Sequence, residues 1–337
     1  MIREAIETLV RGESLSANAA AGAMTEIMNG EATPAQFAAF VTALRMKGET
    51  PEEIAGMARV MRDKSLHVAV EGALVDTCGT GGDASGTFNV STTAGFVVAG
   101  AGVKVAKHGN RAMSGATGSA DVLEALGVKI DLSPAGVKRC LDEAGFGFMF
   151  AQRFHPSMKF AAGPRREIAI RTVFNILGPL TNPAGAAAQL IGVADPALGP
   201  KMARVLHILG TKHALVVHGM DGMDEVTISD ATRIWELKNG DVTEYVVTPE
   251  ELGVERAARE TLRASDSLHS ASIARNVLEG VPGPHRDIVL VNAAAALLAA
   301  DRAATLKDGV RLAAESIDSG KAKRVLDTLA RLSRTLS

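Results

Sequence analysis

The chain has 337 residues, with 34 glycines and only 4% aromatic residues, a length that predicts two domains or one large domain with a smaller appendage. The formal net charge of −2 gives no support to a general nucleic-acid binder or to a protein of anionic membrane surfaces. Two cysteines are too few for a disulfide framework, and no signal-peptide core or membrane-length apolar run occurs, so we expect a soluble, cytoplasmic protein.

Residues 1 to about 66 carry helical signals only, and we place the helical domain at residues 1–70. Thr33-Pro-Ala-Gln36 and Thr50-Pro-Glu-Glu53 are capping boxes with proline at the first helical position. We predict a small all-helical domain of four helices, joined by helices near residues 165–185. Its small size suggests that it is stabilised by contacts with the rest of the chain or with a second copy. We expect it to form the interface of a homodimer.

From Leu74 onwards, short β-type runs alternate with helices. The predicted strands are Val103–Ala106, Val128–Ile130, Gly147–Phe150, Gln189–Val193 and Ala214–Val217, with a hairpin formed by Arg233–Lys238 and Thr243–Val247. The predicted helices include Ser119–Leu126, Ala271–Leu278, Ile288–Ala300, Leu306–Ser319 and Lys321–Ser333. This alternation predicts an α/β domain over residues 71–337, with a mostly parallel central sheet flanked by helices and ligands beyond the carboxyl ends of the strands.

The glycine-rich stretch Asp76–Thr92 lies between the first β-type run and a buried helix. Gly79, Gly81 and Gly82 leave backbone N–H groups bare, and a glycine turn before a helix N-terminus favours an anion. The stretch lacks the Gly-Lys-Ser/Thr of nucleoside-triphosphate hydrolases. Residues 99–103 lack the acidic residue that a dinucleotide fingerprint places about 20 positions on, so a dehydrogenase is disfavoured. An ordinary flexible loop is the plain alternative.

Four further polar stretches follow predicted strands: Lys107–Gly115, Phe154–Lys159 with Arg165-Arg166 beyond it, Arg171–Pro183 and His218–Glu225. Each has a plain structural alternative when taken singly, since Asp224-Glu225 is most often a solvated acidic turn and an arginine pair is most often surface charge. Together, a phosphate loop, a cationic loop, a carboxylate pair and an arginine predict a diphosphorylated sugar held with Mg²⁺ beside an anionic or polar acceptor.

These motifs, in this order, resemble those of the anthranilate phosphoribosyltransferase family. They are Gly79-Thr-Gly-Gly-Asp83, Asn89-Val-Ser-Thr92, Lys107-His-Gly-Asn-Arg111, Gly118-Ser-Ala-Asp-Val-Leu-Glu-Ala-Leu-Gly127, Phe154-His-Pro156, Arg171-Thr-Val-Phe-Asn-Ile-Leu-Gly-Pro-Leu-Thr-Asn-Pro183 and Asp224-Glu225. The resemblance covers essentially the whole chain. It implies a helical domain beside an α/β domain, dimerisation through the helical part and a place in tryptophan biosynthesis.

Carried over residue by residue, the resemblance implies three sets of contacts. Phosphoribosyl pyrophosphate would be bound by Gly79, Gly82, Asp83, Thr87, Asn89, Val90, Ser91, Thr92, Lys107, His108, Gly109, Asn110, Arg111, Ala112, Met113, Ser114, Gly115 and Ser119. Anthranilate would be bound by Gly79, Asn110 and Arg165, and Mg²⁺, as two ions, by Ser91, Asp224 and Glu225. Ala169 stands where the family commonly has glycine.

The implied reaction transfers the phosphoribosyl group to the amine of anthranilate and releases pyrophosphate. Negative charge on the leaving group would be stabilised by Mg²⁺, by the loop N–H groups and by Lys107. No strong general base is required; Lys107 and His108 are the catalytic candidates, and neither is assigned. Two alternatives stay open: a pyrimidine nucleoside phosphorylase of related fold, and a non-enzymatic paralogue that binds nucleic acid. We expect no nucleic-acid or membrane partner.

Overall fold

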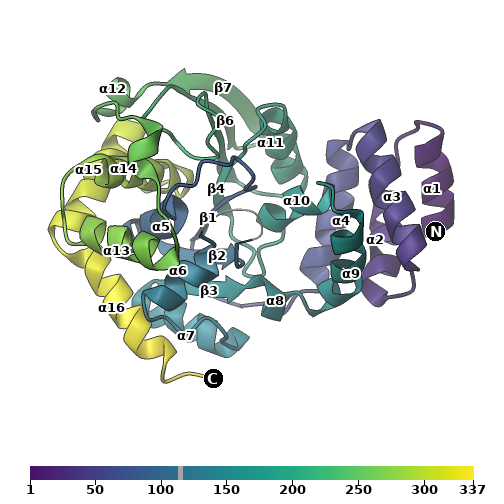
Figure 1. Cartoon of the computed structure of the whole chain (residues 1–337), viewed down its shortest axis with the longest axis horizontal. Helices are drawn as coiled ribbons and strands as arrows, with labels where there is room; N and C mark the ends of the chain where they lie inside the picture. The colour runs from purple at the N-terminus through teal and green to yellow at the C-terminus, as the bar shows by residue number, and fades with distance from the viewer. Residues whose placement is uncertain (113–116) are drawn as a thin grey trace.

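Four helices form the N-terminal domain, which lies to one side of a larger α/β domain in the computed structural model of residues 1–112 and 117–337 (Figure 1). They are α1 (Ile2–Val10), α2 (Ala17–Asn29), α3 (Pro34–Lys47) and α4 (Pro51–Asp63). Both predicted capping boxes are confirmed, because Thr33 accepts from the Gln36 N–H and Thr50 from the Glu53 N–H. These caps satisfy helix N-terminal donors and so determine where α3 and α4 begin.

A seven-stranded sheet forms the centre of the α/β domain. Its strands are β1 (Leu74–Gly79), β2 (Lys104–Gly109), β3 (Phe146–Phe150), β4 (Ala188–Gly192), β5 (His213–Gly219), β6 (Thr232–Lys238) and β7 (Asp241–Val247). The order is β3-β2-β1-β4-β5-β6-β7, with β1–β5 parallel and the β6–β7 hairpin antiparallel. The chain leaves β1 towards β2 and β3 and returns on its other side at β4. The strand order therefore reverses between β1 and β4, where open α/β sheets bind their ligands.

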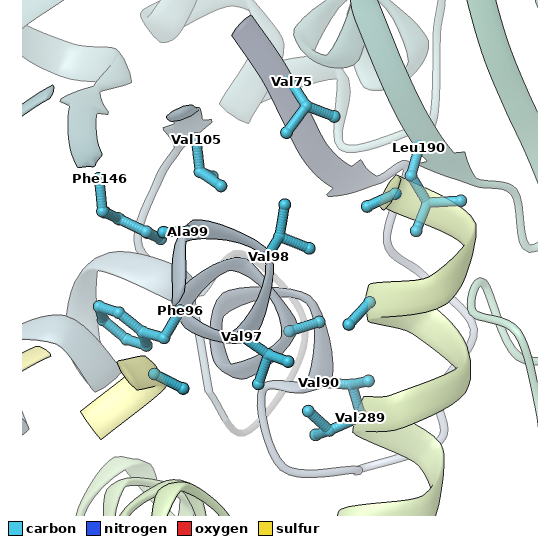
Figure 2. Packing of buried hydrophobic residues seen from close by; sticks show 14 of the residues in the cluster. Val75, Val90, Phe96, Val97, Val98, Ala99, Val105, Phe146, Leu190 and Val289 are labelled. Atoms are coloured by element: carbon cyan, nitrogen blue, oxygen red, sulfur yellow. The ribbon is translucent and has the colours of Figure 1, made fainter. Parts of the chain in front are cut away.

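Helices cover both faces of this sheet. One core contains α5 (Val90–Gly100), α6 (Ser119–Ala125), α7 (Pro134–Ala144), α13 (Ser267–Leu278), α14 (Pro284–Ala299), α15 (Leu306–Asp318) and α16 (Lys321–Ser333). Figure 2 shows Phe96 and Val98 of α5 packed among strand residues such as Val105. On the opposite face, α11 (Leu198–Ile208) packs against β5 and β6. Within the described residues, no helix is both long and apolar enough to span a membrane.

The second core is shared between the two domains. Helix α9 (Lys159–Ile168) packs against α2 and α3, and α10 (Phe174–Leu177) packs against α4. The rings of Phe37 and Phe174 lie 5.3 Å apart between centroids, and the Arg62 Nε donates to the Leu180 carbonyl at 2.6 Å. Segments 159–180 of the α/β domain therefore complete the hydrophobic core of the helical domain.

The predicted strand Val128–Ile130 is wrong. This segment has irregular backbone between α6 and α7, although Val128 and Ile130 are both buried. The Lys129 N–H donates to the Ser333 Oγ at 3.0 Å, so the segment is bonded to α16 instead of to a strand. The sequence pattern is strand-like here because buried Val128 and Ile130 alternate with exposed Lys129. The other predicted strands and the hairpin are confirmed.

Candidate active site

Four neighbouring strands of the sheet end in glycine at the same edge. These residues are Gly79, Gly109, Gly192 and Gly219. A Cβ at Gly192 would lie 1.6 Å from the Asp224 carbonyl oxygen, and one at Gly79 would lie 2.3 Å from the Asp224 Oδ2. Cβ atoms at Gly109 and Gly219 would likewise lie within 2.5 Å of polar side-chain oxygens. Loop residues thus pack directly on the strand ends, which leaves backbone N–H and C=O groups close to any ligand.

The glycine loop lies at this edge, and the Gly81 N–H is already bonded to the Asp224 carboxylate. Gly81 and Gly82 are exposed and have φ values of 63° and 85°, which favour glycine. Asn89 caps α5 by accepting from the Thr92 N–H at 3.0 Å. The Ser270 Oγ of α13 accepts from the Asn89 N–H at 2.9 Å and holds the cap in place. The N-terminus of α5 therefore lies directly after the glycine loop, with the Thr92 N–H capped by Asn89.

Lys107 is a buried cation beneath the loop, and its side chain is only 2% exposed. Its Nζ donates to the Ser91 Oγ at 3.1 Å and to the Thr77 carbonyl. Burial lowers the pKa of Lys107, and the nearby Asp76 carboxylate opposes that shift. Burial raises the pKa of Asp76 to about 6, while Lys107 and the Asn182 amide, 2.7 Å away, oppose the rise. Lys107 is thus placed to supply positive charge at Ser91.

Three carboxylates gather where the glycine loop meets the turn after β5. The Asp224 Oδ2 accepts from the Gly81 N–H at 2.8 Å. Desolvation and the charge of Asp83 raise the pKa of Asp224 to about 7. Desolvation and the charge of Asp224 raise the pKa of Glu225 well above its ordinary value. Unbalanced negative charge of this kind suits a divalent cation.

These residues fit Mg²⁺ in the form that phosphate-binding enzymes use. Within residues 1–112 and 117–337, no cluster of three His, Cys, Asp or Glu side chains could hold a metal alone. Mg²⁺ is usually held by one or two carboxylates together with substrate phosphates and water. Asp224 and Glu225 beside the glycine loop provide that partial set of ligands.

The cationic loop after β2 is described only in part. Met113, Ser114 and Gly115 lie outside the described residues. Arg111 is directed towards α6, since its guanidinium contacts Glu124 at 2.6 and 2.9 Å and Asp121 at 2.9 Å. The Asn110 carbonyl accepts from the Ser119 Oγ at 3.3 Å. Arg111 was predicted to contact a phosphate. In this structure its guanidinium pairs with the carboxylates of Asp121 and Glu124 instead.

His108 lies at the base of the same loop and next to His155. The ring centroids are 4.9 Å apart, and the Nε2 atom of each ring is buried with no partner among the described residues. Burial, aided by His155, lowers the pKa of His108 to about 3, and burial lowers that of His155 to about 4. Both rings are neutral near pH 7. A general base functions best with a pKa near the working pH, so His108 is a weak proton acceptor.

Two arginines of the connection that leads to the helical domain are candidates for ligand contacts, and one of them contacts the glycine loop. Arg165 of α9 is half-buried, with its guanidinium carbon 5.3 Å from the centre of the Phe174 ring, whereas Arg166 is exposed. Burial lowers the pKa of Arg165, but arginine stays charged in proteins. Arg171 donates to the Gly81 carbonyl at 3.2 Å and so contacts the loop directly.

The sequence reasoning assigned no role to Arg171 or to Ser270. Arg171 opens a motif that had been singled out, and its type alone could have suggested a contact with the phosphate loop. Ser270 lies 181 positions from Asn89, and nothing local in its helix distinguishes it from an ordinary small helical residue.

Comparison with known proteins places this arrangement in a family. The sequence pattern of the glycosyl transferase family, helical bundle domain, matches residues 3–65, and that of its a/b domain matches residues 71–323. The anthranilate phosphoribosyltransferase of Symbiobacterium thermophilum is 58% identical over 98% of this chain and 97% of its own. That of Dehalococcoides mccartyi is 55% identical over 100% of this chain and 99% of its own.

Solved structures agree with these relatives. The anthranilate phosphoribosyltransferase of Thermus thermophilus superposes with a TM-score of 0.93 at 44% identity, over 98% of this chain and 99% of that one. The Saccharomyces cerevisiae enzyme in complex with PRPP and Mg superposes with a TM-score of 0.92 at 27% identity, over 99% and 98%. The chain therefore belongs to the glycosyl transferase family with a helical bundle domain. Within it, the chain is a member of the anthranilate phosphoribosyltransferase family.

Proposed function

We propose that this chain transfers the phosphoribosyl group of 5-phosphoribosyl 1-pyrophosphate (PRPP) to the amine of anthranilate, in tryptophan biosynthesis. The amine nitrogen forms a bond to C1 of the ribose, and the bond from C1 to the pyrophosphate oxygen breaks. Pyrophosphate leaves with the electron pair, and the new ammonium group loses a proton to water. The products are N-(5-phosphoribosyl)anthranilate and pyrophosphate.

One observation carries this proposal: the phosphate loop and the carboxylate turn meet at the point where the strand order reverses. Gly81 donates its N–H to Asp224 at 2.8 Å, and Asp224 packs on the ends of β1 and β4. We assign the pyrophosphate of PRPP to the glycine loop and to the N-terminus of α5. The sugar and acceptor then lie beyond the carboxyl ends of the strands.

Mg²⁺, as two ions, is assigned to Ser91, Asp224 and Glu225 together with the phosphates of PRPP. When bound, it stabilises the charge that develops on the departing pyrophosphate. Lys107 supports Ser91 from below and adds a fixed positive charge in a site of low dielectric. The remaining PRPP contacts implied by the resemblance, from Gly79 to Ser119, stay part of this proposal, except that Arg111 would have to leave Asp121 and Glu124 to contribute.

Anthranilate is assigned to Gly79, Asn110 and Arg165. Arg165 is half-buried, and no carboxylate of the described residues pairs with its guanidinium, so it is available for a planar carboxylate. A bidentate contact of this kind fixes the orientation of the acceptor. Aligning two substrates replaces several kcal/mol of the barrier. Positioning and charge stabilisation therefore carry the rate, because His108 is too weak a base.

We assign a homodimer to the helical domain. Val10 of α1 and Met46 of α3 are apolar side chains that are 71% and 83% exposed, and burial against a second copy would remove them from water. Light scattering after size exclusion tests this: twice the chain mass is expected for the wild type, and Val10→Asp with Met46→Glu should shift the mass towards the monomer. A wild-type protein with the mass of a single chain would contradict the assignment of a homodimer.

The decisive experiment follows the loss of anthranilate fluorescence in the presence of PRPP and Mg²⁺. We expect turnover that EDTA abolishes and excess Mg²⁺ restores, and a loss of at least 100-fold in Asp224→Ala/Glu225→Ala. The same protein should not cleave uridine or thymidine with phosphate. Phosphorolysis without anthranilate turnover would favour a nucleoside phosphorylase, and retained DNA binding at moderate salt would favour the nucleic-acid-binding alternative.

A further inference from the structure

Asn292 is a buried amide in an apolar helix. Residues 288–299 of α14 are all buried, and all except Asn292 are aliphatic. Asn292 itself is 0% exposed. An amide at such a position is costly unless its hydrogen bonds are made inside the protein. A polar side chain here needs a reason, and its contacts provide one.

The Asn292 side chain bonds to both backbone groups of a single residue, Val226. Its Oδ1 accepts from the Val226 N–H at 2.9 Å, and its Nδ2 donates to the Val226 carbonyl at 2.8 Å. The Nδ2 also donates to the Ile288 carbonyl at 2.8 Å, within the helix. Paired contacts of this kind fix the position and the orientation of the Val226 peptide groups. Val226 follows Glu225 directly in the chain.

The acidic turn is consequently held at both ends. On one side, Asp224 bonds to the Gly81 N–H at 2.8 Å and packs on Gly192. On the other side, Val226 is held by Asn292, and Val226 is itself fully buried. Glu225 lies between these two fixed points. Small displacements of a ligand carboxylate change metal affinity strongly, because geometry determines the binding of Mg²⁺.

Helix α14 also contacts the helix that carries the phosphate loop. The packing of α14 against α5 is extensive, and Figure 2 shows Val289 of α14 beside Val90, the first residue of α5. One rigid helix therefore supports the N-terminus of α5 through apolar packing and the acidic turn through an amide. This arrangement keeps the phosphate-binding and metal-binding parts at a constant separation.

We propose that Asn292 is a positioning residue for the Asp224-Glu225 pair, which it orients through the backbone of Val226 without touching metal or substrate. The proposal rests on the assignment of that pair as Mg²⁺ ligands. Outer-shell partners of metal ligands typically contribute 10–100-fold to metal affinity or activity. Asn292→Leu keeps the volume of the side chain and removes all three hydrogen bonds. Asn292→Asp is isosteric and keeps the acceptor for the Val226 N–H.

The test measures binding of Mn²⁺, a substitute for Mg²⁺, by electron paramagnetic resonance with and without PRPP. We expect the PRPP-dependent affinity for Mn²⁺ to fall about 10-fold or more in Asn292→Leu and less in Asn292→Asp. The Mg²⁺ concentration for half-maximal activity should rise in parallel, while KM for anthranilate stays close to that of the wild type. If Asn292 had a purely structural role, its substitution would lower stability without weakening Mn²⁺ binding or raising the Mg²⁺ requirement.

Ser316→Ala is the matched control. The Ser316 side chain is also buried among the C-terminal helices, at 2% exposure, and its Oγ donates to the Val97 carbonyl at 2.8 Å. It makes no contact with the acidic turn, so its loss should lower the melting temperature and leave Mn²⁺ binding unchanged.

The outcomes separate two failures. Wild-type affinity for Mn²⁺ with PRPP in a folded Asn292→Leu variant overturns the role of Asn292 alone. No PRPP-dependent Mn²⁺ binding in the wild-type chain overturns the metal assignment, and the role of Asn292 with it. If Asn292→Leu does not fold, Asn292→Asp is compared with the wild type in the same measurements. Wild-type affinity for Mn²⁺ together with wild-type Mg²⁺ dependence of activity in Asn292→Asp would contradict the proposal.

Discussion

At the scale of single residues, two adjacent arginines in α9 have different surroundings. Arg165 is half-buried above the Phe174 ring, whereas Arg166 is exposed. A guanidinium held against an aromatic ring is pre-oriented and partly desolvated, which strengthens its interaction with a carboxylate. The structure therefore favours Arg165, the residue that the resemblance implies, over Arg166 for the proposed contact with anthranilate.

We expect Arg165→Ala to raise KM for anthranilate about 10- to 100-fold, because a hydrogen bond to a charged group contributes about 1.5–3 kcal/mol. KM for PRPP should change little. Steady-state kinetics with each substrate varied in turn measure both effects, and Arg166→Ala is the control, with both constants near the wild type. Equal losses for the two substrates in Arg165→Ala would contradict the assignment.

The buried histidines predict a pH dependence of stability. Burial lowers the pKa of His155 to about 4 in the folded chain, while an unfolded histidine titrates near pH 6.5. The unfolded chain therefore binds an additional proton between these values, and stability falls as the pH decreases from about 6.5 to about 4. The loss is at most about 1.4 kcal/mol for each pH unit.

We expect His155→Gln to remove this contribution, so that its unfolding free energy decreases by about 2 kcal/mol less than that of the wild type between pH 7.5 and pH 5. Urea titrations at the two pH values measure the difference. His67 is exposed, and His67→Gln should behave as the wild type does. A wild-type pH slope in His155→Gln would show that the ring is already charged when folded.

At the scale of elements, the ends of the strands determine how closely the loops approach. A Cβ at Gly192 would lie 1.6 Å from the Asp224 carbonyl oxygen, and backbone cannot move aside as a flexible side chain can. We expect Gly192→Ala to lower stability by about 1–3 kcal/mol and to weaken Mg²⁺-dependent turnover by at least 10-fold, since the Asp224 backbone must shift.

Thermal unfolding and Mg²⁺ titrations of turnover test this effect. Gly163 of α9 is the control, because a Cβ there meets nothing within 4 Å and alanine favours a helix. Gly163→Ala should be as stable as the wild type or more so. Normal Mg²⁺ dependence in Gly192→Ala would mean that the turn has room that the structure does not show.

Local signals were sufficient to predict most elements from the sequence. The capping boxes at Thr33 and Thr50 and the alternation of strands with helices depend on neighbours in the chain. Distant contacts could not be predicted in this way. Val128–Ile130 is not a strand because the Lys129 N–H bonds to Ser333 of α16, 204 positions away. Arg111 pairs with Asp121 and Glu124 of α6, which are 10 and 13 positions away.

The same distinction applies to the site. Motif residues could be assigned from the sequence because they follow strands in a recognisable order. Asn292 and Ser270 could not be assigned from the sequence, because neither lies in a motif. Asn292 contacts a partner 66 positions away, and Ser270 contacts one 181 positions away. Ala169 is intermediate: it has a φ of 51° at the end of α9, a left-handed conformation that favours glycine.

At the scale of the whole molecule, the two domains share one hydrophobic core. Phe40 of α3 is 0% exposed, and the same cluster contains Ile191 of β4 and Trp235 of β6, the single tryptophan of the chain. Because apolar side chains of both domains are buried against one another, the helical domain cannot unfold without exposing apolar surface of the sheet. We therefore expect one cooperative transition.

Tryptophan fluorescence and far-ultraviolet circular dichroism should report the same melting temperature. Phe40→Ala should lower stability by about 3–5 kcal/mol and shift both signals together, although Phe40 lies in the helical domain and Trp235 in the sheet. Glu13→Ala is an exposed control that should leave the transition unchanged. Separate transitions would indicate that the domains unfold independently.

The four glycines that end neighbouring strands have a consequence for redesign. Because polar loop atoms already occupy the space of their missing Cβ atoms, a combinatorial library that seeks new aromatic amines as acceptors gains nothing from diversifying these positions. The α9 side offers freedom instead, since Ala162 and Ile170, which precede and follow Arg165 in the chain, are exposed. Acceptor scope in this scaffold should therefore be broadened from the α9 side, with the strand termini kept invariant.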